Sequence, residues 1–288
     1  MPENTWNYII GDIHGCYDEL ILLEKKIKNH AKKNNVLPYI ISVGDLIDRG
    51  NKSADVIEHF RLGYKNGTHI AMMGNHELLM IEALEAFAPF NFEKENCNYP
   101  TWFYNYFLNY EEGRGMSKFL TWEDYKTMTK SIWLGQGGFT TLVSYGCDPY
   151  QSDSWNIPSE TISYLINLPF YLEKDNFVVT HALPIPKDLI FSKNILEGKK
   201  NNKLEIDSPQ ELRNSLHSLV WNRVIPEIRI HETKIHISGH TPLAKIKRNK
   251  KAASVQIDTA CVFGGKLTAM CVENNTYLSV KALKNYLQ

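Results

Sequence analysis

Side chains that can bind metal ions or transfer protons follow five short apolar runs in the sequence. Within a few residues, each run is followed by aspartate, asparagine or histidine: Asp12 and His14, Asp45, Asn75 and His76, His181, and His240. An apolar run of this length is typical of a buried strand. In an α/β protein, the carboxyl ends of the strands meet at one edge of a sheet, where ligands bind. The spacing therefore predicts one polyvalent metal site at this edge.

The types of these side chains indicate which ions would bind. Asp12 and His14 are separated by one residue, so both can point to the same side and chelate one ion. The Asp45 carboxylate can bridge two ions, and the second ion would take Asn75, His181 and His240. Carboxylate, amide and imidazole ligands without cysteine suit manganese, iron or zinc better than magnesium or calcium. We expect two divalent or trivalent ions, manganese first, with iron or zinc as alternatives. Such a pair, about 3.5–4 Å apart, can share a hydroxide and clamp a phosphoryl group.

The remaining polar residues of these loops can act on a phosphate ester. Because Asn75 is expected to bind metal, the side chain of its neighbour His76 points elsewhere and is free to protonate the leaving oxygen. Asp48 can orient the other nitrogen of that imidazole. Arg49 offers a planar fork to phosphate oxygens, and Arg223 a second one. We expect both arginines, together with Asn75, to contact the substrate.

Helices between the strands must hold these loops in place. Two strand–helix–strand units are expected before residue 75, with helices beginning near Tyr17 and Ser53, so the first three strands should be parallel and adjacent. After His240, the segments 254–259, 266–273 and 276–280 are separated by turn residues and predict an antiparallel meander. We expect a single domain over residues 1–288.

The stretch from about 89 to 135 departs from this pattern. It is rich in tyrosine, tryptophan and phenylalanine and predicts short helices packed as a cap, with a base-stacking or peptide-docking surface as the alternative. The insert also has an excess of acidic residues, namely Glu93, Glu95, Glu111, Glu112, Glu123 and Asp124. An acidic cap would repel a polyphosphate tail.

Composition limits the other function classes. Lysine and arginine equal aspartate and glutamate at 32 each, which argues against nucleic acid as a partner. The five cysteines form no CxxC pair, which favours a reducing compartment over a disulfide framework. No apolar run approaches 18 residues and no leader pattern opens the sequence, so we expect a cytoplasmic protein without a membrane partner. The oligomeric state is left open.

Three motifs at these loops carry a family resemblance: Gly-Asp-Ile-His-Gly at 11–15, Gly-Asp-Leu-Ile-Asp-Arg-Gly at 44–50 and Gly-Asn-His-Glu at 74–77. With the later His181 and Gly239-His240-Thr241, they closely resemble the phosphoprotein phosphatase branch of the calcineurin-like metallophosphoesterases. Compact bacterial and phage-type serine/threonine phosphatases and symmetrical diadenosine tetraphosphate hydrolases are the nearest in pattern. The resemblance implies an α/β fold, a four-layer α/β/β/α metallophosphoesterase sandwich, here with an aromatic-rich helical cap insert.

The resemblance also implies roles for individual residues. Asp12 and His14 would hold the first metal and Asp45 would bridge. The second metal would take Asn75, His181 and His240, while His76 with Asp48 would form the acid pair. Arg49 and Arg223 would bind phosphate; Arg223 rests on the short Trp221-Asn-Arg223 match.

Two substrates fit this chemistry. The first expectation is a phosphomonoesterase acting on phosphoserine or phosphothreonine in proteins, or on a small phosphoester, by attack of a metal-bridging hydroxide. The alternative is hydrolysis of diadenosine tetraphosphate. A third reading, an inactive binding scaffold, is disfavoured because every expected ligand and the acid pair are present. The acidic insert favours the phosphomonoester.

Overall fold

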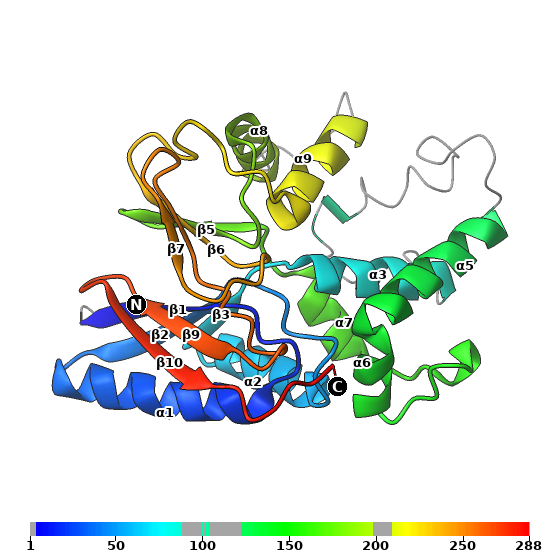
Figure 1. Ribbon diagram of the computed structural model, residues 1–288. Coiled ribbons are helices and arrows are strands. Elements are labelled where there is room, and N and C mark those ends of the chain that lie inside the picture. Colours follow the sequence, from blue (N-terminus) through cyan, green and yellow to red (C-terminus); the bar gives the residue numbers. More distant parts are fainter. Residues whose placement is uncertain (1–3, 88–99, 101, 104–121, 198–208, 288) are drawn as a thin grey trace.

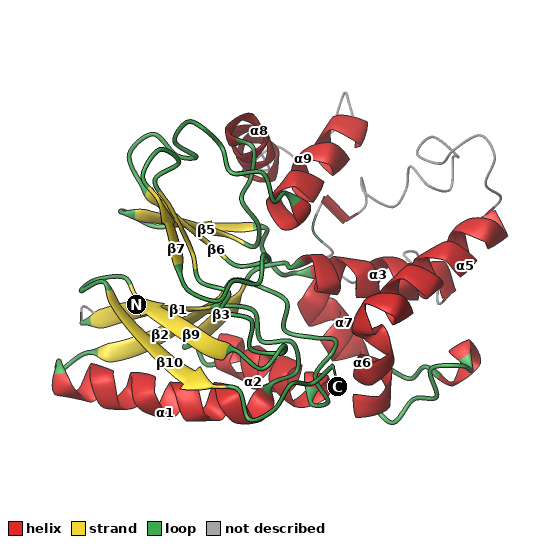
Figure 2. Cartoon of the chain, in the orientation of Figure 1, coloured by secondary structure: helices red, strands yellow, loops and turns green. Residues whose placement is uncertain are grey.

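Two five-stranded sheets pack face to face, with helices on the outer face of each (Figures 1 and 2). The structure is a computed structural model that describes residues 4–87, 100, 102–103, 122–197 and 209–287. The resulting layers are helix, sheet, sheet and helix, so the expected α/β sandwich is confirmed.

The first sheet contains the two strand–helix–strand units. Its strands, in the order β10-β9-β1-β2-β3, are β1 (Thr5–Ile10), β2 (Leu37–Ser42), β3 (His69–Ala71), β9 (Lys266–Cys271) and β10 (Thr276–Lys281). β1, β2 and β3 are parallel, as the sequence predicts, and β9 is antiparallel to β1. Helices α1 (Tyr17–Lys33) and α2 (Ser53–Lys65) make the crossovers. On α1, Leu20, Leu23 and Ile27 repeat at helical spacing and are fully buried.

The second sheet has the order β4-β5-β6-β8-β7. Its strands are β4 (Tyr171–Glu173), β5 (Phe177–Thr180), β6 (Ile235–Ser238), β7 (Lys247–Asn249) and β8 (Ser254–Gln256). Helices α8 (Pro186–Glu197) and α9 (Pro209–Trp221) join β5 to β6 and cover the outer face (Figure 1).

The predicted meander after His240 is wrong in one strand. β9 and β10 form an antiparallel hairpin, but β8 joins the other sheet and runs parallel to β6. All three residues of β8 are buried, and Val255 packs between the sheets. Burial on both faces is typical of a strand inside a sandwich, and β8 accordingly lies between β6 and the preceding strand β7, to which it is antiparallel.

The core between the sheets fixes how their strand ends align. Residues of alternating strand positions meet there, among them Ile9, Ile41 and Met72 from the first sheet and Phe177 and Ile237 from the second. The neighbours of Ile9, Tyr8 and Ile10, face the helical layer instead. Both faces of β1 are therefore apolar, and its carboxyl end meets those of the second sheet at one end of the sandwich.

Helices follow β3 at that same end. They are α3 (Asn75–Phe87), α5 (Trp122–Trp133), a π-turn at Leu134–Gly138, α6 (Phe139–Ser144), a 3₁₀ turn at Ser152–Ser154 and α7 (Ser159–Ile166). α3 begins at Asn75, directly after the loop that follows β3, and packs against α5 (Figure 1).

Only part of the aromatic insert lies within the described residues. Trp102 and Phe103 are buried, and the Trp102 ring meets Phe170 edge-on at 4.9 Å. These two rings are therefore core. Tyr125 and Trp133 are buried as well. The aromatics from Tyr104 to Tyr110 and the acidic Glu93, Glu95, Glu111 and Glu112 lie outside the described residues. No helix in the described ranges is long and apolar enough to cross a membrane.

Candidate metal centre

The predicted metal ligands come together where the loops of the two sheets meet. Asp12 and His14 follow β1, Asp45 follows β2, Asn75 opens α3, and His181 and His240 follow β5 and β6. All six are buried, with exposures of 5% or less. Side chains from both sheets therefore line one buried centre.

Backbone geometry at this centre is unusual. His14, Asp45, Asp48, Arg49 and His240 have φ between 47° and 71°, a left-handed conformation that side chains other than glycine rarely adopt. Such strain persists only where the surrounding structure enforces it, and it concentrates at functional sites. Gly239 is needed for a different reason: a Cβ there would lie 1.9 Å from Asp12 Oδ1.

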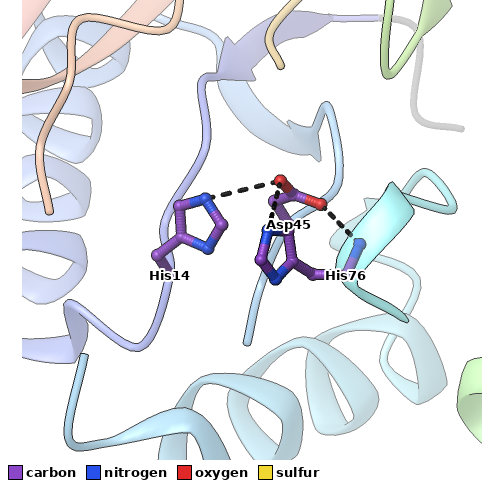
Figure 3. Close-up of side chains that lie close together, drawn as sticks. All are labelled: His14, Asp45 and His76. Carbon is purple, nitrogen blue, oxygen red and sulfur yellow. Dashed lines mark hydrogen bonds and ion pairs between the residues drawn. The ribbon is translucent and has the colours of Figure 1, made fainter. Parts of the chain in front are cut away.

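His14, Asp45 and His76 form the first group of side chains close enough together to hold a metal ion (Figure 3). Asp45 Oδ2 lies 3.4 Å from His14 Nε2 and 3.9 Å from His76 Nε2. The backbone N–H of His76 donates to Asp45 Oδ1 at 3.1 Å. These contacts hold the carboxylate between the two imidazoles.

The second group is centred on the amide oxygen of Asn75. His181 Nε2 and His240 Nδ1 each lie 2.9 Å from Asn75 Oδ1. Asp45 Oδ1 is 3.4 Å from His181 Nε2, so the two oxygens of Asp45 face different groups. This is the position that a bridging carboxylate requires.

The carboxylate of Asp12 is held by the backbone of His240. Both of its oxygens accept the N–H of His240, at 3.1 and 3.0 Å. Burial and the nearby carboxylate of Asp258 raise the pKa of Asp12 well above its usual range. Asp258 itself is buried, which raises its pKa to about 6. The sequence pattern gave no reason to single out Asp258.

Two imidazoles of the centre are oriented by backbone carbonyls. His14 Nδ1 donates to Ile47 O at 2.8 Å and His181 Nδ1 to Val43 O at 3.0 Å, while His240 Nε2 lies 3.1 Å from Trp221 O. In the neutral ring of His181, Nε2 then carries a lone pair that points at oxygens of Asn75 and Asp45. Facing lone pairs repel unless a proton or a metal ion lies between them. The donor set therefore fits a metal ion, and carbonyl-oriented histidines are typical of metal ligands.

Electrostatics support the same conclusion. Burial lowers the pKa of His14 well below its usual range and that of His240 to about 3, so neither competes for protons. Burial would also lower the pKa of His181, but the carboxylate of Asp45 outweighs it and raises the value to about 9. A metal at His181 would displace that proton.

His76 also belongs to a separate hydrogen-bonded pair. Its Nδ1 lies 2.7 Å from Oδ2 of Asp48, a carboxylate with no exposed surface. Thr141 donates to Asp48 Oδ1 at 2.6 Å, and Trp133 Nε1 donates at 3.2 Å. Sequence reasoning missed Thr141 and Trp133, which lie 93 and 85 residues from Asp48 and carry no local signal.

Glu77, the last residue of the Gly-Asn-His-Glu motif, holds two loops of the centre together. Its buried carboxylate accepts the N–H groups of Asp45 at 2.9 Å, Leu46 at 2.8 Å and Gly74 at 2.9 Å. Burial and the charge of Asp45 raise the pKa of Glu77 to about 7. Glu77 thus ties the loop after β2 to the loop after β3.

Two guanidinium groups flank the centre from the solvent side. Arg49 donates to His14 Nε2 at 2.6 Å and to His76 Nε2 at 2.9 Å, and Arg223 Nε lies 3.2 Å from His240 Nε2. The Arg49 guanidinium also lies over the Phe263 ring, 5.6 Å from its centroid. A cavity of about 210 Å³ opens here, lined by Asp45, Arg49, Asn75, His76, Gln136, Trp221, Arg223, His240, Pro242 and Phe263.

Solved structures with this fold include phosphatases. A candidate diadenosine tetraphosphatase superposes with a TM-score of 0.52 at 18% identity, covering 98% of this chain and 96% of the other. A cold-active protein tyrosine phosphatase gives 0.50 at 15% identity, covering 100% and 82%. At these identities the likeness concerns the fold.

Curated relatives share more of the sequence. The chain is 26% identical to the asymmetrical bis(5'-nucleosyl)-tetraphosphatase PrpE of Oceanobacillus iheyensis, over 97% of this chain and 93% of the relative. Over 27% of the chain and 26% of the relative, it is 35% identical to a symmetrical bis(5'-nucleosyl)-tetraphosphatase of Actinobacillus pleuropneumoniae. The profile of the calcineurin-like phosphoesterases matches residues 8–264. With this match added to the fold and the buried loop-end centre, the chain belongs to the calcineurin-like phosphoesterase family.

Proposed function

We propose that the chain is a metal-dependent phosphohydrolase whose centre holds two ions at the loop ends. His14 and Asp12 would serve one ion, Asn75, His181 and His240 the other, and Asp45 both. The observation that carries this is Asp45, whose two oxygens face imidazoles of different groups at 3.4 Å. When bound, the ions would activate water and neutralise phosphate charge. Manganese is the expected metal, with iron or zinc as alternatives.

The protein's own residues would handle the proton and the phosphate. His76, held by Asp48, would protonate the oxygen that leaves phosphorus. Arg49 and Arg223 would bind non-bridging phosphate oxygens, because both guanidinium groups line the cavity above the centre. Arg49 would exchange its present contacts with His14 and His76 for the substrate.

For the substrate, we propose a dinucleoside tetraphosphate. Three relatives that match nearly the whole chain carry that activity in their names, and all three are named as the asymmetrical form. The lining of the cavity also suits part of a nucleotide, since the rings of Trp221 and Phe263 lie there beside the two arginines. Phe263 is 41% exposed, so its ring can stack on a base.

Phosphoserine or phosphothreonine in a protein is the second candidate. Its support is the charge of the insert, where six acidic residues against five lysines and arginines would repel a polyphosphate slightly. The same insert, as a cap, would then control access to the centre.

A substrate comparison tests both candidates. The manganese-loaded chain would be assayed with diadenosine tetraphosphate and with a phosphopeptide at equal concentration, and the nucleotide products separated. We expect kcat/KM for the dinucleotide to be at least tenfold higher. Asymmetrical cleavage gives AMP and ATP, whereas symmetrical cleavage gives two ADP. A preference for the phosphopeptide would overturn the first candidate, and no turnover of either substrate or of an aryl phosphate would overturn the phosphohydrolase proposal itself.

A further inference from the structure

A second histidine-rich group lies away from the centre, on the helical face of the first sheet. It consists of Glu24 on α1, His59 on α2 and His69, the first residue of β3. We call these three residues the α1–α2–β3 cluster. Their donor atoms all lie within 4.8 Å of one another. The candidate metal centre follows the carboxyl end of β3, whereas this cluster is at its beginning.

The two imidazoles converge on one oxygen of the glutamate. His59 Nε2 lies 2.5 Å and His69 Nε2 3.2 Å from Glu24 Oε1. The rings cross almost at right angles, 5.1 Å apart. The Glu24 side chain is only 1% exposed, and that of His59 is 21% exposed. The cluster is thus a buried acid with two nitrogens directed at it and an open edge at His59.

Hydrogen bonds fix the tautomer of His69. Thr68 Oγ1 donates to Gly63 O at 3.1 Å and lies 2.8 Å from His69 Nδ1. Since a hydroxyl has one proton, Nδ1 of His69 is the donor to Thr68 when Thr68 donates to Gly63. In the neutral ring, Nε2 then directs a lone pair at the carboxylate oxygen of Glu24. Two facing lone pairs at 3.2 Å are unfavourable, so this contact calls for a proton on Nε2 or a metal ion between the two atoms.

The chain also makes room for this ring. Gly63 lies within α2, and a Cβ there would be 2.2 Å from His69 Nδ1. Glycine within a helix costs about 0.5–1 kcal/mol relative to alanine. The helix carries this cost at the position where His69 packs.

We propose that the α1–α2–β3 cluster is a second metal site, in which Glu24, His59 and His69 bind a Zn²⁺ ion that ties two helices to the sheet. Two imidazoles and a carboxylate are common zinc ligands, and water from the open edge would complete the four. Zinc–nitrogen bonds of about 2.0–2.1 Å in a tetrahedron place neighbouring donors roughly 3.3 Å apart. The present separations of 2.5 and 3.2 Å need only a small opening.

One neighbouring cation competes with such an ion. Lys28 Nζ lies 3.1 Å from Glu24 Oε2, one turn along α1, and its side chain is 65% exposed. Removing this charge should favour metal binding, whereas it should only weaken a simple ion-pair network. The sign of the Lys28 effect therefore separates the two interpretations.

The test counts zinc in the full chain. Wild type, His59→Gln/His69→Gln and the control His30→Gln would be stripped with chelator, loaded with Zn²⁺, desalted and analysed by elemental mass spectrometry. We expect the double variant to hold one zinc per chain fewer than wild type and the control to match wild type. Because the loop-end centre is intact in all three, the difference belongs to the α1–α2–β3 cluster. Equal zinc in wild type and the double variant would overturn the proposal.

A second measurement tests the proposal even if the double variant fails to fold. Lys28→Ala leaves all three ligands in place, and its zinc titration should show one site with several-fold higher affinity than in wild type. At the same Co²⁺ concentration, Lys28→Ala should show a stronger visible absorption band of tetrahedral cobalt than wild type. Unchanged or weaker binding in Lys28→Ala would contradict the metal site.

Discussion

Asp48 Oδ2 lies 2.7 Å from Nδ1 of His76, and neither side chain is more than 1% exposed. A buried carboxylate at this distance holds the imidazole with Nδ1 protonated, so Nε2 is directed toward Asp45 and the cavity. His76 is therefore already oriented before a substrate enters.

His76→Asn should lower the rate about 10²–10⁴-fold on a substrate with a poor leaving group, the usual worth of general acid catalysis. The leaving group of an aryl phosphate needs little protonation, so the loss of rate on that substrate should be much smaller. Metal content, measured in parallel, should stay at the wild-type level. An equal loss on both substrates would remove His76 from the role of acid.

Thr141→Val should lower kcat with little change in KM, because it removes the 2.6 Å hydrogen bond that holds Asp48. A buried acceptor that loses its partner costs about 1–3 kcal/mol, so stability should fall as well. Thr141→Ser keeps the hydroxyl and should restore most of kcat. If serine and valine behave alike, the hydroxyl does not position Asp48.

Asp45→Asn should abolish turnover and most metal binding at the loop-end centre. The change removes the negative charge that faces both groups of ligands, whereas the shape is nearly kept. Metal retained after desalting is the measurement. An Asp45→Asn chain with wild-type metal content and turnover would contradict the proposed pair of ions.

Arg49→Ala and Arg223→Ala should each raise KM and weaken inhibition by free phosphate without changing metal content. Both guanidinium groups line the cavity, and a phosphate oxygen loses a charged donor in either variant. Wild-type kinetics and phosphate inhibition in Arg223→Ala would show that the Trp221-Asn-Arg223 match was accidental.

His236 should make stability depend on pH. It is fully buried on β6, and burial lowers its pKa to about 3. Its Nε2 donates to Thr180 Oγ1 at 2.7 Å, while Nδ1 has no hydrogen-bond partner among the described residues, so a proton added there would be unpaired. The unfolded chain binds this proton near pH 6.5 and the folded chain does not, so stability falls as pH falls from 6.5 toward 3.

Between pH 7 and pH 5 the loss attributable to His236 is about 2 kcal/mol, from the two pKa values. Urea unfolding at both pH values measures it. His236→Leu should lose this part of the pH dependence, and an unchanged slope in that variant would contradict the assignment.

The sequence was sufficient to predict the elements with a clear period. The apolar spacing of Leu20, Leu23 and Ile27 gave α1, and the polar residues at strand ends met at one centre because parallel strands share an edge. β8 was misplaced because a buried strand of three residues does not encode its partner. Thr141 and Trp133 escaped notice since their contact with Asp48 arises only when distant segments pack.

Backbone strain at the centre lowers the stability of the fold. Five residues there have left-handed φ angles, namely His14, Asp45, Asp48, Arg49 and His240. Each such residue costs about 1–2 kcal/mol that glycine would avoid. Selection for heat resistance alone would therefore drive these positions toward glycine and remove the side chains proposed to bind metal and phosphate. If these five side chains serve the proposed activity, the chain keeps them at a cost in stability, and thermostabilising mutations should be sought elsewhere in the sandwich.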